Sequence, residues 1–515
     1  MLDSESTQPI GIGATAAGTR AYAERHVAAG RHPSAYRALG RTGLTVSGVG
    51  FGGYRVSVAE DHHLEALQLA LDGGCNLIDT STNYGDGASE RLLGSVLSHV
   101  DLDVRMGLVV VSKVGYVQGS NLREARDRER RGSGTLEMVR YTDGCWHCIH
   151  PSFIADQLGR TLERTGLARI DGYLLHNPEY FFSDLARRRD PRPLEERRVE
   201  FYERVTRAFE SLELEVRSGR IGWYGVSSNT LAQAEDRPEA TSLVRFLECA
   251  ERAAGSGAHH FSVAQLPFNL LEPAAALKRV SGGARGRTVL EVAAEAGIGV
   301  LCNRPLNALG GGGLTRLADF QLAPPGQRTD RLAHAVARLE AEFAGGLAHA
   351  IHTSGGRQTT FDLGPSAVRV AGDLQDAIRW DEYVRDVLSP DLSERVRAID
   401  QALTGPMKAA WQIWLERYVE ALGHLLEGLR IQCARSSQRK SDQIARALAP
   451  WLPAERDGAT LSQKATATIL GQTGVTSVLV GMRHRRYVSD TLGVLDWAPI
   501  AVPAEALRKI SRGGP

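Results

Sequence analysis

Four polar residues of this chain have side chains that can hold or transfer a proton, and each lies at or just after an apolar segment. Asp79 ends NLID, Tyr84 follows in TSTNYG, Lys113 ends VVVSK and His176 ends YLLH. Taken singly, such residues are more often caps, packing groups, solvated charges or satisfied core histidines than catalysts. Because the carboxyl ends of parallel strands meet at one side of a barrel, their common placement favours a shared site.

These residue types suit the interconversion of a carbonyl and an alcohol. Hydride added to a carbonyl carbon leaves negative charge on the oxygen, so a proton must arrive. A phenol has an ordinary pKa of about 10, and a neighbouring ammonium group lowers it. We therefore expect Lys113 to activate Tyr84 as the general acid or base, with Asp79 keeping the ammonium charged. His176 is expected to donate a hydrogen bond to the oxyanion, and this chemistry requires no metal.

The elements that must position these residues alternate between apolar strands and amphipathic helices. After a predicted hairpin around Gly40–Gly43, eight strands are predicted, one ending at Phe51 and the others at 75–80, 108–113, 170–176, 221–228, 261–269, 297–303 and 476–481. Continuous β-branched runs indicate strands covered on both faces, and the alternation with helices indicates a parallel sheet. Eight units favour a closed (β/α)8 TIM barrel. The absence of GxGxxG or GxxxxGK[ST] after the first strand argues against Rossmann and P-loop folds.

The pattern divides the chain into four regions. Residues 1–35 are rich in small and polar types without a sustained apolar period, so we predict a flexible N-terminal extension. The barrel takes residues 36–309 plus 459–500. A large helical insertion, 310–458, separates strands seven and eight, and 501–515 form a C-terminal tail.

The insertion is far longer than an ordinary strand–helix connection. It is predicted to form helices over 329–352, 375–388, 393–403 and 407–434. In the last of these, residues at helical spacing favour core packing: Trp411, Trp414, Leu415, Tyr418, Leu422, Leu425 and Leu429. Because the insertion follows the seventh strand, we expect it to cap the barrel mouth. A cap can exclude water, shape a pocket for a larger substrate or form an oligomer contact.

The bulk composition excludes several function classes. Lys and Arg number 61 against 60 Asp and Glu, a formal net charge of +1, which is not the balance of a nucleic-acid-binding protein. No apolar stretch is long enough to cross a bilayer, and the N-terminus lacks the architecture of a signal peptide. We therefore expect a cytoplasmic protein with a small-molecule partner and neither a nucleic-acid nor a membrane partner.

The cysteines are sparse, and in a reducing compartment the expectation is free thiols. The segment CWHCIH contains Cys145 and Cys148 and looks like half of a zinc site. No second ligand pair follows at finger spacing, so a structural loop or a substrate contact is favoured over a metal site.

Five segments resemble successive signatures of the aldo-keto reductase family: NLIDTSTNYGDGASERLLG, VVVSKVG, IDGYLLHNPE, GRIGWYGVSSN and VTSVLVGMR. The resemblance covers roughly residues 36–309 and 459–495. It implies an (α/β)8 barrel that binds NADP(H), less often NAD(H), across its mouth. It also implies that Asp79, Tyr84, Lys113 and His176 form the catalytic tetrad, with all four identities kept.

The resemblance also implies a set of cofactor-binding residues at the nicotinamide end: Gly53, Tyr54, Ser227, Ser228, Gln265 and Asn303. Ser227 and Gln265 match residues that bind the nicotinamide carboxamide. Ser228 stands where the family usually has Asn, and Asn303 where it commonly stacks a Tyr under the nicotinamide.

At the pyrophosphate and adenosine end, the implied residues are Pro305, Leu306, Gly481, Arg483, Asp490 and Thr491. Asp490 and Thr491 replace the usual Glu–Asn pair near the adenine. Arg483 and the basic residues after it suit a 2′-phosphate or, equally, a solvated helix start. The expected cofactor is therefore NADP(H), with NAD(H) as the alternative.

The favoured function is an NAD(P)(H)-dependent oxidoreductase acting on an aldehyde, ketone or sugar-like metabolite, or on the corresponding alcohol. Two alternatives stay open. The missing stacking Tyr permits an epimerase or lyase that uses a tightly held cofactor without net redox change. A cofactor-binding sensor or partner subunit, like the β-subunits of potassium channels, is the other.

Overall fold

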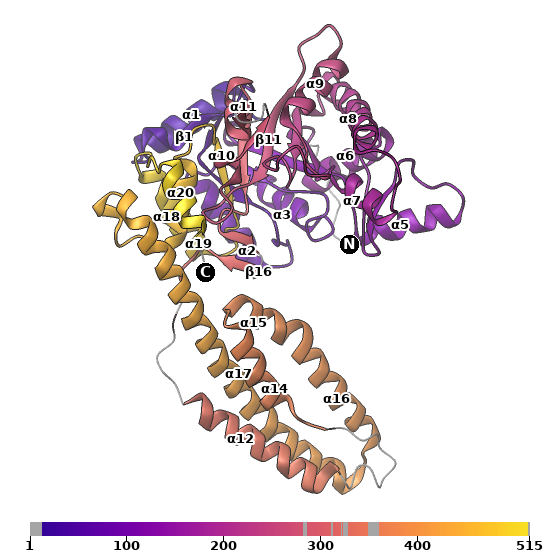
Figure 1. Ribbon diagram of the computed structural model, residues 1–515, viewed down its shortest axis with the longest axis vertical. Helices are drawn as coiled ribbons and strands as arrows, with labels where there is room; N and C mark the ends of the chain where they lie inside the picture. The colour runs from indigo at the N-terminus through magenta and orange to yellow at the C-terminus, as the bar shows by residue number, and fades with distance from the viewer. Residues whose placement is uncertain are drawn as a thin grey trace. The chain divides into compact units, whose positions relative to one another are not determined.

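The computed structural model describes residues 13–281, 286–310, 313–320, 322, 328–348 and 360–512 (Figure 1). The chain forms two compact units. The first contains the residues up to Ala308 together with those from Leu448 onward, and the second is Leu309–Ala447. None of the helices in the described parts of the chain combines the length and apolarity needed to cross a bilayer.

The first unit is a closed barrel of eight parallel strands that neighbour one another in chain order, which confirms the predicted (β/α)8 fold. The strands are β3 (Val49–Gly52), β4 (Leu77–Asp79), β5 (Val109–Val114), β9 (Ile170–His176), β10 (Ile221–Ser227), β11 (Phe261–Pro267), β14 (Gly299–Asn303) and β17 (Ser477–Val480). Nearly every strand residue is buried, as continuous apolar runs require.

A helix follows each barrel strand and precedes the next, and the last helix follows the final strand β17. These helices are α2 (Asp61–Asp72), α3 (Ala88–Leu97), α6 (Pro151–Thr165), α8 (Leu194–Arg217), α9 (Leu243–Ala254), α11 (Val289–Glu295), α18 (Leu461–Leu470) and α19 (Arg485–Leu492). Two begin with a reciprocal capping box, α11 at Thr288 and α18 at Thr460. These local signals fix where the helices start.

Additional elements follow the strands that carry the polar residues. After β5 come β6 (Tyr116–Val117), α5 (Gly119–Arg130), β7 (Val139–Thr142) and β8 (Cys145–His147), whose strands form an antiparallel sheet in the order β6-β8-β7. Helix α7 (Tyr180–Arg187) follows β9. Shorter elements are α4 (Leu102–Arg105), α10 (Ala274–Leu277), β12 (Arg279–Ser281), β13 (Arg287–Thr288), β15 (Asn307–Gly310), β16 (Gly313–Arg316) and α20 (Ala504–Arg512).

The N-terminal region differs from the prediction of a flexible extension over residues 1–35. Residues 1–12 lie outside the described residues, but 13–35 are ordered and include helix α1 (Ala16–Ala28). Tyr22 is buried and its hydroxyl donates to the Leu71 carbonyl, while the Ala14 amide donates to Asp171 at 2.7 Å. The prediction is wrong there because so weakly amphipathic a helix is stabilised by tertiary contacts, which its own sequence does not display. The predicted hairpin is confirmed as β1 (Tyr36–Ala38) paired with β2 (Thr45–Ser47).

The second unit is helical. Its helices are α12 (Thr329–Glu342), α14 (Leu363–Leu374), α15 (Ala377–Tyr383), α16 (Ser389–Ala402) and α17 (Gly405–Leu448), with α17 the long helix in Figure 1. The last predicted helix, 407–434, is therefore longer than expected, and residues 349–352 of the first lie outside the described residues. Trp414 stacks between Trp411 and Tyr418, with ring centroids 5.4 and 4.8 Å away. The predicted core packing of these aromatics is confirmed. A capping role for the insertion stays a prediction.

Candidate active site

Three of the four predicted proton-transfer residues are in direct contact. Asp79 ends β4, Lys113 lies on the neighbouring strand β5, and Tyr84 lies on the loop that leads from β4 to α3. Lys113 is fully buried, and its Nζ donates to Asp79 Oδ2 at 2.8 Å, to the Thr80 carbonyl at 2.7 Å and to the Tyr84 hydroxyl at 3.2 Å. All three ammonium protons are thereby used, so the side chain has one favoured position.

The fourth residue, His176, ends β9, the strand next to β5. Its ring centroid lies 6.0 Å from that of Tyr84, with the rings nearly perpendicular. Ser81 Oγ lies 3.1 Å from His176 Nδ1, and His147 donates from Nε2 to the His176 carbonyl at 2.7 Å. Ser81 therefore contacts the ring of His176, and His147 fixes the backbone of the same residue.

The burial of the site sets its charges. Burial lowers the pKa of Lys113, but Asp79 and Tyr84 outweigh it and raise the pKa overall, so the ammonium stays charged. Burial raises the pKa of Asp79, and Lys113 opposes that shift. The pKa of His176 lies well below its ordinary value, because of burial first and then the nearby Lys113 and His147. His176 is thus a neutral imidazole at neutral pH.

The pKa of Tyr84 does not follow the simple expectation of activation by an ammonium. Lys113 lowers it, but burial raises it more, and the net direction is upward. Desolvation of a phenolate outweighs one favourable charge here. In this state Tyr84 is therefore a protonated phenol at neutral pH, which suits giving a proton rather than taking one.

Several residues predicted to bind cofactor extend the same hydrogen-bond network. Gln265 on β11 donates from Nε2 to Asp79 Oδ1 at 2.7 Å, and Ser227 at the end of β10 donates to Gln265 Oε1 at 2.9 Å. Asn303 at the end of β14 also donates to Gln265 Oε1, at 3.4 Å. These bonds join three further strand ends to the buried Asp79–Lys113 pair.

This arrangement leaves a donor and an acceptor free. Gln265 Nε2 has a second proton beyond the one given to Asp79. Asn303 Oδ1 is buried, and no described residue forms a hydrogen bond to it. A primary carboxamide carries one acceptor and two donors, so the residues present fit the nicotinamide carboxamide that the resemblance implies.

Gly53 and Tyr54 lie beside the network. The Gly53 amide donates to the Asp79 carbonyl at 2.7 Å, and a Cβ on Gly53 would come within 2.6 Å of Ser89 Oγ and 2.8 Å of that carbonyl. Only glycine fits this approach. The Tyr54 ring is 60% exposed and lies 5.3 Å from the Tyr84 ring, edge to face. Tyr54 is thus an exposed aromatic surface next to the proton-transfer residue.

Ser228 is not brought into the network of Ser227 and Gln265. Its hydroxyl is fully buried and bonds to Thr241 at 2.9 Å and Thr230 at 3.2 Å. The neighbouring backbone stays tied to β11, because the Ser228 amide donates to the Gln265 carbonyl at 3.0 Å.

The residues predicted for the pyrophosphate and adenosine end differ in their exposure and in their contacts. Pro305 is buried, Leu306 and Arg483 are partly exposed, and Gly481 is exposed after β17. Asp490 accepts from Thr460 at 2.8 Å and from Ser462 at 2.6 Å, so its two carboxylate oxygens hold the start of α18. Thr491 is buried at 3% exposure. The structure therefore shows a structural role for Asp490, and its contact with the adenine stays a prediction.

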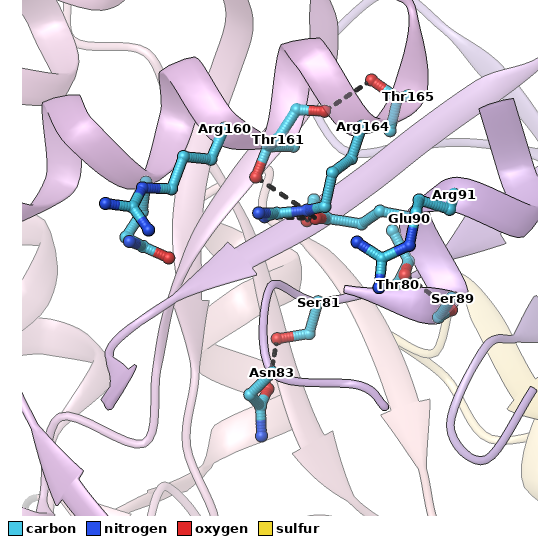
Figure 2. A network of polar contacts seen from close by, with 12 residues as sticks. Thr80, Ser81, Asn83, Ser89, Glu90, Arg91, Arg160, Thr161, Arg164 and Thr165 are labelled. Carbon is cyan, nitrogen blue, oxygen red and sulfur yellow. Dashed lines mark hydrogen bonds and ion pairs between the residues drawn. The ribbon is translucent and has the colours of Figure 1, made fainter. Parts of the chain in front are cut away.

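Sequence reasoning missed a polar cluster behind the site, shown in Figure 2. Glu90 on α3 is fully buried and accepts from Ser112 at 2.6 Å, Thr161 at 3.0 Å and Arg164 at 2.6 Å. Ser112 directly precedes Lys113, so the cluster braces the strand that carries the ammonium. No local motif reveals it, because the partners come from different elements. Ser81 was missed for the same reason, and the bond of His147, in the segment CWHCIH, to the His176 carbonyl was not predicted either.

Cys145 and Cys148 are buried free thiols. Across the described residues, no group of three or more His, Cys, Asp or Glu side chains is arranged to hold a metal ion. Cys148 Sγ lies against the Leu136 carbonyl and the His150 amide, which makes it part of the loop structure before α6.

Comparisons with known proteins agree with the geometry. Curated relatives include a Schizosaccharomyces pombe protein named as a voltage-gated potassium channel subunit beta, 26% identical over 231 residues, or 41% of this chain and 54% of that protein. Arabidopsis thaliana L-galactose dehydrogenase is 38% identical over 99 residues (18% and 31%), and Pseudomonas D-threo-aldose 1-dehydrogenase 31% over 157 (29% and 45%). The matches thus span about a third to a half of these relatives' lengths.

Two solved structures are similar over most of their chains. One is an aldo-keto reductase from Bacillus halodurans (15% identity, 93% of this chain and 95% of that one, TM-score 0.44). The other is the glycerol dehydrogenase of Gluconobacter oxydans (17%, 93% and 95%, TM-score 0.46). The sequence model described as the Aldo/keto reductase family matches residues 48–355, more than half of the chain. The chain belongs to the aldo/keto reductase family.

Proposed function

We propose that the protein is an NADP(H)-dependent oxidoreductase that interconverts a carbonyl and an alcohol, with Tyr84 as general acid or base. The observation that carries this proposal is the buried Lys113 ammonium, which contacts both Asp79 and the Tyr84 hydroxyl. Two of the relatives are named as dehydrogenases of L-galactose and of a D-threo-aldose. We infer from these names that a sugar-like aldehyde or hydroxyl compound is the substrate class.

The residues of the site divide the work of the reaction. When bound, the cofactor supplies or accepts the hydride. Tyr84 gives its hydroxyl proton to the substrate oxygen in reduction, and the fixed charge of Lys113 stabilises the phenolate that remains. The neutral His176 donates a hydrogen bond to the same oxygen when the proton is on the ring nitrogen that faces it. In this structure the Ser81 hydroxyl donates to Asn83 Oδ1 at 2.7 Å, so the nitrogen that faces the substrate carries the proton only when that hydroxyl turns to donate to His176 Nδ1.

Ser227, Gln265 and Asn303 would hold the nicotinamide carboxamide through the free donor and acceptor described above. Arg483 and the basic residues after it, at the start of α19, favour NADP(H) over NAD(H) by offering charge-assisted bonds to a 2′-phosphate.

The test uses the purified full-length protein, NADPH and a panel of aldehydes and aldoses, with absorbance of the reduced nicotinamide as readout. We expect consumption that Tyr84→Phe reduces by at least about a hundredfold, with the Kd for NADPH unchanged. Tyr383→Phe, which alters a phenol of the second unit, is the matched control and should keep full turnover. Turnover that survives Tyr84→Phe contradicts the assigned role.

A second candidate follows from the yeast relative named as a channel subunit. A cofactor-binding sensor or partner subunit would bind NADPH without consuming it with any member of the panel. An epimerase or lyase would convert substrate without net change in nicotinamide absorbance. Chromatography of the reaction mixture would then detect the product.

A further inference from the structure

A buried carboxylate, for which the described residues supply no counter-ion, lies three residues after His176. Glu179 is 3% exposed, and its Oε1 accepts the Asn229 amide at 2.8 Å. Its Oε2 is buried and has no hydrogen-bond partner among the residues that the structure describes. No ion pair to this carboxylate is formed within the part of the chain that the structure describes. Such a group is costly to bury, so it is rarely retained without a role.

Glu179 belongs to a clamp between the ends of β9 and β10. The Asn177 amide donates to the Ser227 carbonyl at 2.7 Å, and Asn229 donates to Glu179. Between these two bonds lies Ser227, whose side chain faces the network of Gln265 and Asp79. The carboxylate is therefore attached to the segment 227–229, where the proposed function places the nicotinamide carboxamide.

We propose that Glu179 is a positioning residue whose uncompensated negative charge makes the site bind the oxidised, cationic nicotinamide more tightly than the neutral reduced form. The inference rests on the proposed function. The two cofactor forms differ by one positive charge on the nicotinamide ring. A negative charge held in a partly desolvated environment beside that ring favours the cation by Coulomb attraction. The preference should be about tenfold in Kd, the effect of opposite unit charges separated by about 12 Å at an effective dielectric constant of about 20.

The preference should depend on pH. Burial raises the pKa of Glu179 to about 7, and the Glu179 and Asn229 amides and the nearby Ser228 hydroxyl oppose that rise. The titratable groups that face it are the phenols of Tyr116 on β6 and Tyr180 on α7. Burial raises both of their pKa values, so neither carries charge near neutrality. The carboxylate is charged above about pH 7 and neutral below it, and the preference for the oxidised form rises with pH through this range.

Cofactor binding and the protonation of Glu179 are thermodynamically linked, so each changes the other. A cation bound beside Glu179 lowers the pKa of its carboxyl group, so binding of NADP+ near pH 7 should release protons. NADPH has the same 2′-phosphate and adenosine but no positive ring, so it should release fewer. The difference between the two cofactor forms isolates the nicotinamide charge from every other titrating group that the cofactor contacts.

The experiment measures the Kd of NADP+ and of NADPH for the full-length protein by tryptophan fluorescence and calorimetry, between about pH 6 and about pH 8.5. In the unmodified protein, the ratio Kd(NADPH)/Kd(NADP+) should rise about tenfold over this range. In Glu179→Gln, which keeps the shape and removes the charge, the ratio should stay constant. Glu179→Asp, which keeps a carboxylate, should retain the pH dependence while binding both forms more weakly.

Glu213→Gln is the matched control, because Glu213 is also buried, at 2% exposure, but bonds to Tyr224 and His260. It should leave the ratio and its pH dependence unchanged. If Glu179→Gln does not fold, proton release by the unmodified protein in two calorimetry buffers still tests the inference. A ratio that is independent of pH, or equal in the unmodified protein and Glu179→Gln, overturns the role of Glu179 and leaves the proposed function standing. Failure to bind either cofactor overturns both.

Discussion

Replacement of Lys113 by methionine should show how much stability the protein loses when one partner of the buried Asp79–Lys113 ion pair is removed. Lys113 and Asp79 are 0% and 5% exposed, and their atoms lie 2.8 Å apart. Methionine keeps most of the apolar stem, so packing changes little. Asp79 would retain the bond from Gln265 but lose its only cation among the described residues. Removing one partner of a buried pair leaves an uncompensated charge, which costs about 3–5 kcal/mol.

Protonation of Asp79 limits the free-energy cost of losing Lys113. Asp79 can take up a proton instead of remaining charged. From its ordinary pKa of 3.8, keeping it neutral at pH 7 costs about 4 kcal/mol, at about 1.4 kcal/mol per pH unit. We therefore expect Lys113→Met to lower the free energy of unfolding by about 3–4 kcal/mol at pH 7.

The same reasoning fixes the sign of the pH dependence. In Lys113→Met the folded-state pKa of Asp79 lies above its unfolded value, so the folded state binds more protons. In the unmodified protein burial also raises the pKa of Asp79, although Lys113 opposes that rise. Relative to the unmodified protein, the variant should therefore lose stability as pH rises above the folded-state pKa that Asp79 has beside Lys113, at up to about 1.4 kcal/mol per pH unit. The difference should be smaller at about pH 5 than at pH 7.

The assay is urea denaturation of the full chain combined with hydrogen exchange of peptides that cover β4 and β5. The double variant Asp79→Asn/Lys113→Met removes both charges and should recover most of the lost stability without recovering turnover. A loss below about 1 kcal/mol at pH 7, or a double variant no more stable than Lys113→Met, would refute the claim that this pair is a mutually dependent buried charge pair.

Three further changes test other contacts. Ser81→Ala removes the hydroxyl beside His176 Nδ1, and kcat/KM should fall on the order of ten- to a hundredfold with the cofactor Kd unchanged; an unaltered rate excludes a role in orienting the ring. Asp171→Asn removes the carboxylate charge that accepts hydrogen bonds from Ala14, Val110 and Arg105. It should lower the free energy of unfolding in urea by about 2–4 kcal/mol and speed hydrogen exchange in α1. Unchanged exchange in α1 would contradict the claim that Asp171 holds the N-terminal segment. Trp414→Ala should destabilise the helical unit by about 3–5 kcal/mol, seen as faster exchange in α12 and α17, and protection equal to that of the unmodified protein rules it out as a core residue.

Much of the fold was predictable because its signals are local. Strands buried on both faces require continuous apolar runs, and these runs marked all eight barrel strands. The insertion was recognisable from helical spacing, although the end of α17 at Leu448 was not, because the polar stretch after residue 434 gives no apolar period there. Helix α1 was missed since its burial depends on Tyr22 and Ala14 reaching residues far away in the chain.

The candidate site was partly predictable for the same reason. Polar residues that directly follow apolar strands are visible in the sequence, and barrel geometry brings them to one mouth. The contacts of Lys113 with Asp79 and Tyr84 follow from that placement. The double bonding of Asp490 to Thr460 and Ser462 does not, because it depends on how α18 and α19 pack.

The sequence by itself determined which residue types stand at the strand ends, and with them the kind of chemistry that the site can perform. Only the tertiary structure decided the charge state of those residues. Burial outweighs the ammonium at Tyr84 and keeps His176 neutral. Among the described residues, Glu179 is buried without a counter-ion. The physical reason is that side-chain chemistry is a local property, whereas desolvation depends on every atom that packs around a group, wherever that atom lies in the chain.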